Sequence, residues 1–153
     1  MNQNCSILIV EDDANDVFFL SEAIRRSEVN IPFDVVNDGQ SAIEFLSKAH
    51  ERMQTAAGPV PCIVLLDLNL PRRSGMEVLR WIRQESPCKM IVVVILTASN
   101  SEADMRQAYQ HGANSYVVKP TDVTRLRELS IFLKGYWLGW NQVPALFNGN
   151  GAN

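Results

Sequence analysis

The chain has 153 residues, a net charge of −3, 46% hydrophobic and 20% charged residues, which is typical of one globular domain rather than of a disordered chain. The acidic balance argues against the basic patch that nucleic-acid surfaces carry, so we expect no nucleic-acid partner. No apolar run approaches the about 20 residues that span a bilayer, and no signal peptide is apparent. We therefore expect a soluble, cytoplasmic protein without a membrane partner.

The three cysteines, Cys5, Cys62 and Cys88, are odd in number and lack the spacing of metal ligands. We expect reduced thiols, which suits a cytosolic compartment. Cys62 lies in an apolar run and is predicted to be a small core residue.

Short β-branched runs alternate along the chain with longer stretches of 3.6-residue periodicity. In chain order they predict a strand over 6–10, a helix over 14–27, a strand over 33–36, a helix over 40–49, a loop over 51–61, a strand over 62–67, a helix from Ser74-Gly75 to about Ser86-Pro87, a strand over 90–97, a helix over 101–111, a strand over 115–119 and a last helix from about Thr121-Asp122. Asp13 is placed to cap the first helix, and Gly112 suits the left-handed position after the fourth. The Asn/Gly-rich tail 148–153 is expected to fray.

This alternation predicts an α/β fold, a (βα)₅ doubly wound parallel five-stranded sheet with helices on both faces and right-handed crossovers. Such sheets bind ligands outside the carboxyl ends of their strands.

Polar residues follow or end four of the predicted strands. Glu11 and Asp12 follow the first, Asp67 ends the third, Thr97 ends the fourth and Lys119 ends the fifth. We call these five residues the carboxyl rim. Because parallel strands end at the same edge of a sheet, we expect the carboxyl rim to form one site.

Carboxylates at neighbouring strand ends repel one another unless a cation lies among them, and Mg²⁺ prefers one or two carboxylates together with water and phosphate oxygens. Glu11, Asp12 and Asp67 therefore predict a partly open magnesium site. The alternative is that Glu11-Asp12-Asp13 is only the acidic start of a helix, complementing its dipole.

Asp67 is the predicted nucleophile, since carboxylates can form aspartyl phosphates. Lys119 offers a positive charge to Asp67 and then to a phosphoryl oxygen. Thr97 offers a hydroxyl, and Ala98 beside it leaves room for the phosphoryl group.

Four motifs occur together: Val10-Glu11-Asp12-Asp13, Leu66-Asp67-Leu68-Asn69-Leu70-Pro71 with Gly75, Thr97-Ala98 and Tyr116-Val117-Val118-Lys119-Pro120. Their order and intervals resemble the receiver domain of two-component response regulators over roughly residues 5–134. The resemblance implies a flavodoxin-like fold with strand order 2-1-3-4-5, which is one of the common strand orders of doubly wound sheets.

The resemblance implies that Asp67 is the phosphoacceptor. It gives Glu11 and Asp12 as metal carboxylates and Asn69 as a ligand through its backbone carbonyl, around Mg²⁺ for which Mn²⁺ could substitute. Glu11 stands where aspartate is also common, so whether it binds metal directly or through water stays open.

Thr97 and Lys119 are implied contacts of the phosphoryl group, and Thr97 with Tyr116 forms the implied switch. The alternative for Tyr116 is a half-buried strand aromatic. The bond between Lys119 and Pro120 is expected to be cis.

The function implied is that of a response regulator, which accepts a phosphoryl group from the phosphohistidine of a sensor histidine kinase and then switches protein–protein contacts. It catalyses its own phosphorylation and dephosphorylation and is not a multiple-turnover enzyme. We expect a receiver domain over 1–134, a C-terminal extension over 135–153 and no separate output domain.

The extension and the long loop after the second helix resemble the small regulators paired with cyanobacterial and bacterial phytochromes. That narrower resemblance predicts a phytochrome-type kinase as partner, and a homodimer through the face of helix four, strand five and helix five together with the extension. Trp137 and Trp140 either pack on the domain or form an interface.

Three alternatives stay open. A haloacid-dehalogenase-type phosphatase would need a second acidic residue two positions after its nucleophile, where this chain has Asn69. A flavodoxin-like binding module would need a phosphate loop after the first strand. The third is a pseudo-receiver that works without phosphorylation.

Overall fold

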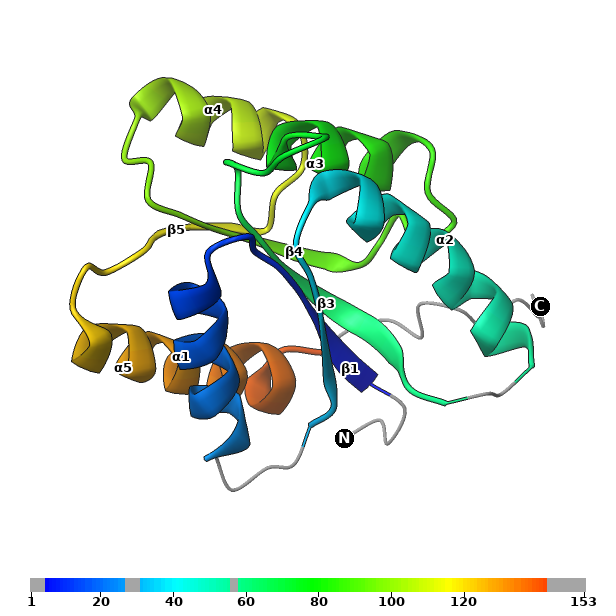
Figure 1. The fold of residues 1–153 in the computed structure, drawn as a ribbon. Coiled ribbons are helices and arrows are strands. Elements are labelled where there is room, and N and C mark those ends of the chain that lie inside the picture. The colour runs from blue at the N-terminus through cyan, green and yellow to red at the C-terminus, as the bar shows by residue number, and fades with distance from the viewer. Residues whose placement is uncertain (1–4, 27–30, 56–57, 143–153) are drawn as a thin grey trace.

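The computed structural model describes residues 5–26, 31–55 and 58–142. Its five strands form one parallel sheet in the order β2-β1-β3-β4-β5, with β3 in the centre (Figure 1). The strands are β1 (Cys5–Val10), β2 (Phe33–Val36), β3 (Val60–Leu66), β4 (Val92–Thr97) and β5 (Ser115–Val118). The predicted doubly wound fold and its strand order are confirmed.

Helices cover both faces of the sheet (Figure 1). One face packs against α1 (Ala14–Arg25) and α5 (Val123–Lys134), and the other against α2 (Gly39–Gln54), α3 (Gly75–Gln84) and α4 (Glu102–Gln110). Because successive side chains of a strand point to opposite faces, Ile7 and Ile9 join the first core while Leu8 and Val10 join the second. None of the described helices is both long enough and apolar enough to cross a bilayer.

Helix starts follow the predicted capping residues. The Asp13 side chain accepts hydrogen bonds from the backbone N–H groups of Asn15 and Asp16, which fixes the first turn of α1 just after β1. Ser74 and Glu77 form a reciprocal capping box at the start of α3. Gly112 has a φ of +93°, the left-handed conformation predicted for it.

The connection into β3 differs from the predicted loop over 51–61. Helix α2 continues to Gln54 and β3 already begins at Val60. Pro61 lies inside β3, where the ladder to β1 is irregular because Ser6 pairs with Pro61 while Ile7 pairs with Ile63. Proline is tolerated near the start of a strand and at such irregularities, since it lacks the N–H that a regular ladder needs.

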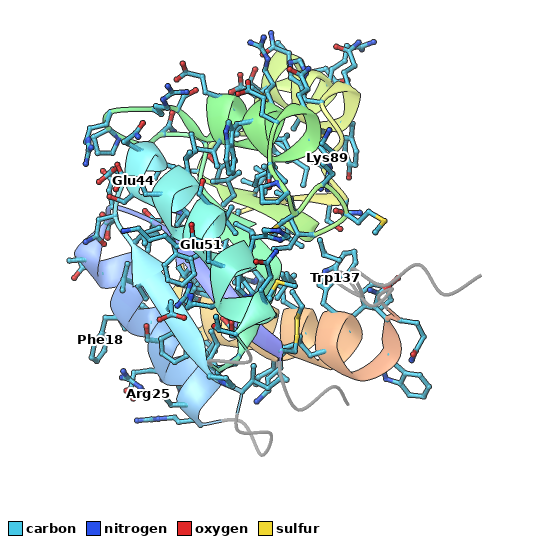
Figure 2. The ribbon with its side chains drawn as sticks, turned by 90° about the vertical axis from the view of Figure 1, so that its right-hand side faces the viewer. Phe18, Arg25, Glu44, Glu51, Lys89 and Trp137 are labelled. Atoms are coloured by element: carbon cyan, nitrogen blue, oxygen red, sulfur yellow. A yellow bond between two sulfur atoms is a disulfide. The ribbon has the colours of Figure 1, made fainter. Side chains whose placement is uncertain are left out.

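The expectation of reduced thiols is wrong for two of the three cysteines. Cys5 and Cys62 are joined by a disulfide, with their Cα atoms 5.5 Å apart, and Figure 2 draws it as a yellow bond. The register irregularity inserts Cys62 between the residues that pair with Ser6 and Ile7, beside the start of β1. Cys62 is a buried core residue as predicted, and Cys88 is a buried free thiol.

A π-helical turn, η1 (Gly135–Trp140), continues α5 directly. Trp137 and Leu138 are half-buried and pack against the core shared by α1 and α5. Tyr136 and Trp140 are 55% and 83% exposed. Trp137 therefore packs on the domain, whereas Trp140 is exposed. The division of the chain at residue 134 stays a prediction, and the tail 148–153 lies outside the described residues.

Candidate functional site

The structure brings the carboxyl rim together at one edge of the sheet. Glu11 and Asp12 follow β1, Asp67 follows β3, Thr97 ends β4 and Lys119 follows β5. The Asp67 N–H donates to the Val10 carbonyl at 3.1 Å, and the Lys119 N–H donates to the Thr97 carbonyl at 2.7 Å. These backbone bonds extend the strand ladders by one residue and fix where the polar side chains begin.

Three carboxylates of the carboxyl rim form a cluster. Glu11, Asp12 and Asp67 each offer an oxygen within 4.8 Å of the others, and Glu11 and Asp67 are buried while Asp12 is exposed. Octahedral Mg²⁺ holds its ligands at about 2.1 Å, so opposite ligands lie about 4.2 Å apart. The cluster therefore fits a small divalent cation with one side open.

Lys119 is the cation that the chain itself supplies. Its Nζ donates to Glu11 Oε2, to Asp16 Oδ2 at 2.9 Å and to Asp67 Oδ2 at 3.0 Å. The Lys119 side chain is only 9% exposed. An ammonium has three donors, and all three are used by carboxylates.

Asp16 is a residue of this site that the sequence analysis missed. It lies in the first turn of α1, four residues after Asp12. Because α1 begins just after β1, a side chain of its first turn lies at the end of the helix that faces the carboxyl rim. The position of Asp16, three residues after the cap Asp13, was the available signal, although it did not say which group Asp16 would meet.

The pKa values reflect the burial of these charges. Burial raises the pKa of Glu11 well above its ordinary value, against hydrogen bonds from Lys119 and Asp13 that lower it. Burial alone would lower the pKa of Lys119, but its hydrogen bonds to Glu11 and Asp16 and the charge of Asp67 raise it. Lys119 is thus held as a cation.

The loop after β4 is tied to two of the predicted switch residues. Thr97 is fully buried, and its Oγ1 accepts from the Ser99 N–H at 3.4 Å. The Tyr116 hydroxyl donates to the Ser99 carbonyl at 3.0 Å. The Ser99 hydroxyl donates to Asp104 Oδ2 in α4 at 2.6 Å. These hydrogen bonds would therefore transmit a displacement of Thr97 through Ser99 to β5 and α4.

The turn after β3 fits closely around Asp67. The Asn69 N–H donates to Asp67 Oδ1 at 3.3 Å. A Cβ at Gly75 would lie 1.9 Å from the Asp67 carbonyl oxygen, so only glycine allows this approach of α3.

The predicted cis bond between Lys119 and Pro120 is wrong, because the described residues contain no cis peptide bond. The trans form of a bond before proline is favoured by about 0.5–1 kcal/mol. Lys119 reaches all three carboxylates with the trans bond.

The sequence profile of the response regulator receiver domain matches residues 7–130. The chain therefore belongs to the response regulator receiver family, as its motifs implied. It is 34% identical over 139 residues to response regulator Rcp1 of Synechocystis sp., covering 91% of this chain and 92% of that protein. It is 37% identical over 139 residues to the probable methanogenesis regulatory protein FilR2 of Methanothrix harundinacea, covering 90% and 86%.

Solved structures of relatives have the same fold. The crystal structure of the Mn²⁺-bound form of Rcp1 superimposes with a TM-score of 0.80 at 33% identity, covering 92% of this chain and 99% of that chain. The phosphorylated cyanobacterial phytochrome response regulator RcpA gives 0.81 at 31% identity, covering 92% and 98%. The family model and these relatives thus agree on the receiver fold that the motifs implied.

Proposed function

We propose that this protein accepts a phosphoryl group on Asp67 from the phosphohistidine of a sensor histidine kinase. The observation that carries the proposal is the position of Asp67, whose side chain is 7% exposed, belongs to the carboxylate cluster and accepts a hydrogen bond from Lys119. A buried carboxylate is costly unless it is paired. Here its charge is balanced by one amine and by a site for a further cation, which suits a group whose charge changes during function.

In the proposed step, an Asp67 oxygen forms a bond to phosphorus while the bond from phosphorus to the donor imidazole nitrogen breaks. The imidazole leaves with the bonding electron pair, and the product is an aspartyl phosphate. Hydrolysis by water later restores the carboxylate and releases inorganic phosphate. The chain catalyses both steps on itself, and no multiple-turnover substrate is expected.

The residues that would hold the metal are Glu11, Asp12 and Asp67 through carboxylates and Asn69 through its carbonyl. Mg²⁺ is proposed because all of these ligands are hard oxygens, and Mn²⁺ could substitute, as in the Mn²⁺-bound form of Rcp1. When bound, the ion would neutralise charge on the phosphoryl oxygens. Both Glu11 oxygens already accept from Lys119 or from the Asp13 N–H, which favours a contribution of Glu11 through water.

Thr97 and Lys119 are proposed to bind the phosphoryl oxygens. A phosphoryl group adds about −1.5 to −2 charge and would draw the Thr97 hydroxyl toward Asp67. Because the Ser99 N–H donates to Thr97 and the Ser99 carbonyl accepts from Tyr116, this movement would release the Tyr116 ring. The exposed face of α4 and β5 would then change, biasing a two-state equilibrium.

The assignment of Asp67 is tested by incubating the protein with Mg²⁺ and acetyl phosphate, a small phosphodonor, and following intact mass. The wild type should gain one hydroxylamine-labile phosphoryl group, and Asp67→Asn none. Asp34→Asn, which changes an exposed aspartate in β2, is the matched control and should react as the wild type does. Labelling of Asp67→Asn would overturn the assignment.

A phytochrome-type kinase is the proposed donor. Support comes from RcpA and from the bacteriophytochrome response regulator RtBRR, to which the chain is 35% identical with a TM-score of 0.66. Phosphotransfer from a panel of purified kinases should be fastest from a phytochrome. Equal or faster transfer from unrelated kinases would refute this pairing. A cytoplasmic location stays part of the proposal, but the Cys5–Cys62 disulfide removes the support that reduced thiols gave it.

A homodimer through α4, β5, α5 and η1 is proposed as the output. Large hydrophobic side chains are exposed on these elements at Tyr109, Val118, Val123, Ile131, Phe132, Tyr136 and Trp140. Sedimentation velocity at tens of micromolar should show a dimer that Phe132→Glu weakens. A monomer with and without beryllofluoride, a phosphoryl analogue, would contradict the proposal.

A further inference from the structure

We propose that Asp16 is a positioning residue for Lys119, which keeps the ammonium facing Asp67 while the charge of Asp67 is consumed by phosphorylation. The inference rests on the proposed function of Asp67. It assigns a role to a side chain outside the carboxyl rim. The observation that carries it is the bond of 2.9 Å from Lys119 Nζ to Asp16 Oδ2.

The three partners of Lys119 differ in what phosphorylation would do to them. Asp67 would lose its free carboxylate to the phosphoryl group. Glu11 belongs to the carboxylate cluster that fits a divalent cation, while Asp16 does not. Asp16 is therefore the one described partner of the Lys119 ammonium that neither accepts the phosphoryl group nor faces the cation.

Asp16 is also well placed to act as a fixed anchor. Its backbone N–H donates to Asp13 Oδ1 at 3.0 Å in the capped first turn of α1. Its side chain is 30% exposed, against 3% for Glu11 and 7% for Asp67. Asp16 thus holds the ammonium from the solvent side of the site, and a helix rather than a loop sets its position.

The anchor should matter most in the transition state. As the new bond to phosphorus forms, the charge on the Asp67 carboxylate falls and Lys119 has to turn toward the phosphoryl oxygens, whereas the charge and position of Asp16 do not change. An interaction accelerates a reaction only if it is stronger in the transition state than before it. Without Asp16, the four-carbon side chain of Lys119 would lose part of its orientation at that moment.

The experiment measures the initial rate of phosphorylation by acetyl phosphate at saturating Mg²⁺. Asp16→Asn keeps the shape and removes the charge, and it should slow the reaction about three- to fivefold, the upper part of the range expected for a partly exposed ion pair. Asp16→Glu keeps the charge and should recover at least half of the lost rate. Asp34→Asn is the control for removing one surface carboxylate.

A double-mutant cycle tests whether Asp16 acts through Lys119. In a Lys119→Met background, followed over hours by intact mass, Asp16→Asn should change the remaining rate by less than about twofold because its partner is gone. If Asp16 only repels the anionic donor, Asp16→Asn should speed the reaction in both backgrounds. That result, or an unchanged rate in the Asp16→Asn single variant, would overturn the proposal.

Two controls separate this proposal from the function on which it rests. If the wild type is not labelled, or if Asp67→Asn is labelled, the assignment of Asp67 fails and Asp16 is not at issue. Titration with Mn²⁺ alone should give half-saturation for Asp16→Asn within about threefold of the wild type, because Asp16 lies outside the cluster. A loss as large as that of Asp12→Asn would make Asp16 a metal residue instead and would contradict the positioning role.

Discussion

The two ends of the central strand β3 are held in opposite ways. At its carboxyl end, Asp67 is held by Lys119 and shares a cluster with Glu11 and Asp12. At its amino end, Cys62 is bonded to Cys5. One end depends on charges that a cation or a phosphoryl group can change, and the other on a covalent bond and apolar packing.

The carboxyl end of β3 therefore serves the chemistry of the site, and its amino end serves the stability of the fold. A change at the carboxyl end should alter phosphorylation and should make stability depend on metal. A change at the amino end should alter stability while leaving phosphorylation intact.

Reducing the disulfide should have the largest effect on stability. Cys5 and Cys62 are 57 residues apart in sequence, and closing a loop of that length stabilises the folded state by up to about 4 kcal/mol. Urea unfolding with and without a thiol reductant measures the loss. The free energy of unfolding of Cys5→Ala should equal that of the reduced wild type and should not change when reductant is added. A changed phosphorylation rate in Cys5→Ala would break the separation of the two ends.

Lys119→Met should destabilise the protein by about 3 kcal/mol in the presence of a chelator, because it leaves the buried carboxylates of Glu11 and Asp67 without their cation. Added Mg²⁺ should recover much of this loss. Lys48→Met, which changes an exposed lysine of α2, should stay within about 0.5 kcal/mol of the wild type in both conditions. A loss that Mg²⁺ does not reduce would count against the metal site.

Gly75→Ala should cost about 1–3 kcal/mol and slow phosphorylation, because the new methyl group would meet the Asp67 carbonyl oxygen at 1.9 Å and the backbone must move. Gly135→Ala is the matched substitution at the far end of α5. It meets nothing within 4 Å and has helical φ and ψ of −58° and −44°. It should stabilise by about 0.5–1 kcal/mol. Equal effects of the two substitutions would refute the close packing around Asp67.

The smallest expected difference in stability is that between alanine substitutions of the two tryptophans of η1. Trp137→Ala should cost about 2 kcal/mol, because Trp137 is half-buried against the core of α1 and α5. Trp140→Ala should stay within about 0.5 kcal/mol, because Trp140 is 83% exposed, but it should weaken the proposed dimer. Thermal unfolding and sedimentation measure the two quantities, and a stability loss at Trp140 as large as that at Trp137 would be contrary to this account.

The sheet and the carboxyl rim could be predicted because each signal is local. An apolar run ends at Val10 or Leu66 and a carboxylate follows, and the parallel topology then brings the ends together. The predicted loop over 51–61 begins too early, because Gly58-Pro59 and Pro61, which indicate it, lie in its second half. Glu51-Arg52-Met53-Gln54 are good helix formers, and the helix continues through them.

The remaining features depend on contacts between distant parts of the chain. Asp16 meets Lys119 across 103 residues of sequence, which no periodicity encodes. The Cys5–Cys62 bond requires the irregular register at Ser6, and cysteine counting alone favoured free thiols. The isomer of the bond before Pro120 depends on its surroundings in the fold and is not set by the dipeptide.

Mapping the phosphoryl group to a single residue decides whether Asp67 is the phosphoacceptor. The protein is incubated with Mg²⁺ and acetyl phosphate, and borohydride then reduces the acyl phosphate so that the modified aspartate becomes homoserine. Peptide mass spectrometry should find homoserine at Asp67 and at none of Asp12, Asp13 and Asp16. Homoserine at one of those residues instead, or none at any position, would contradict the account.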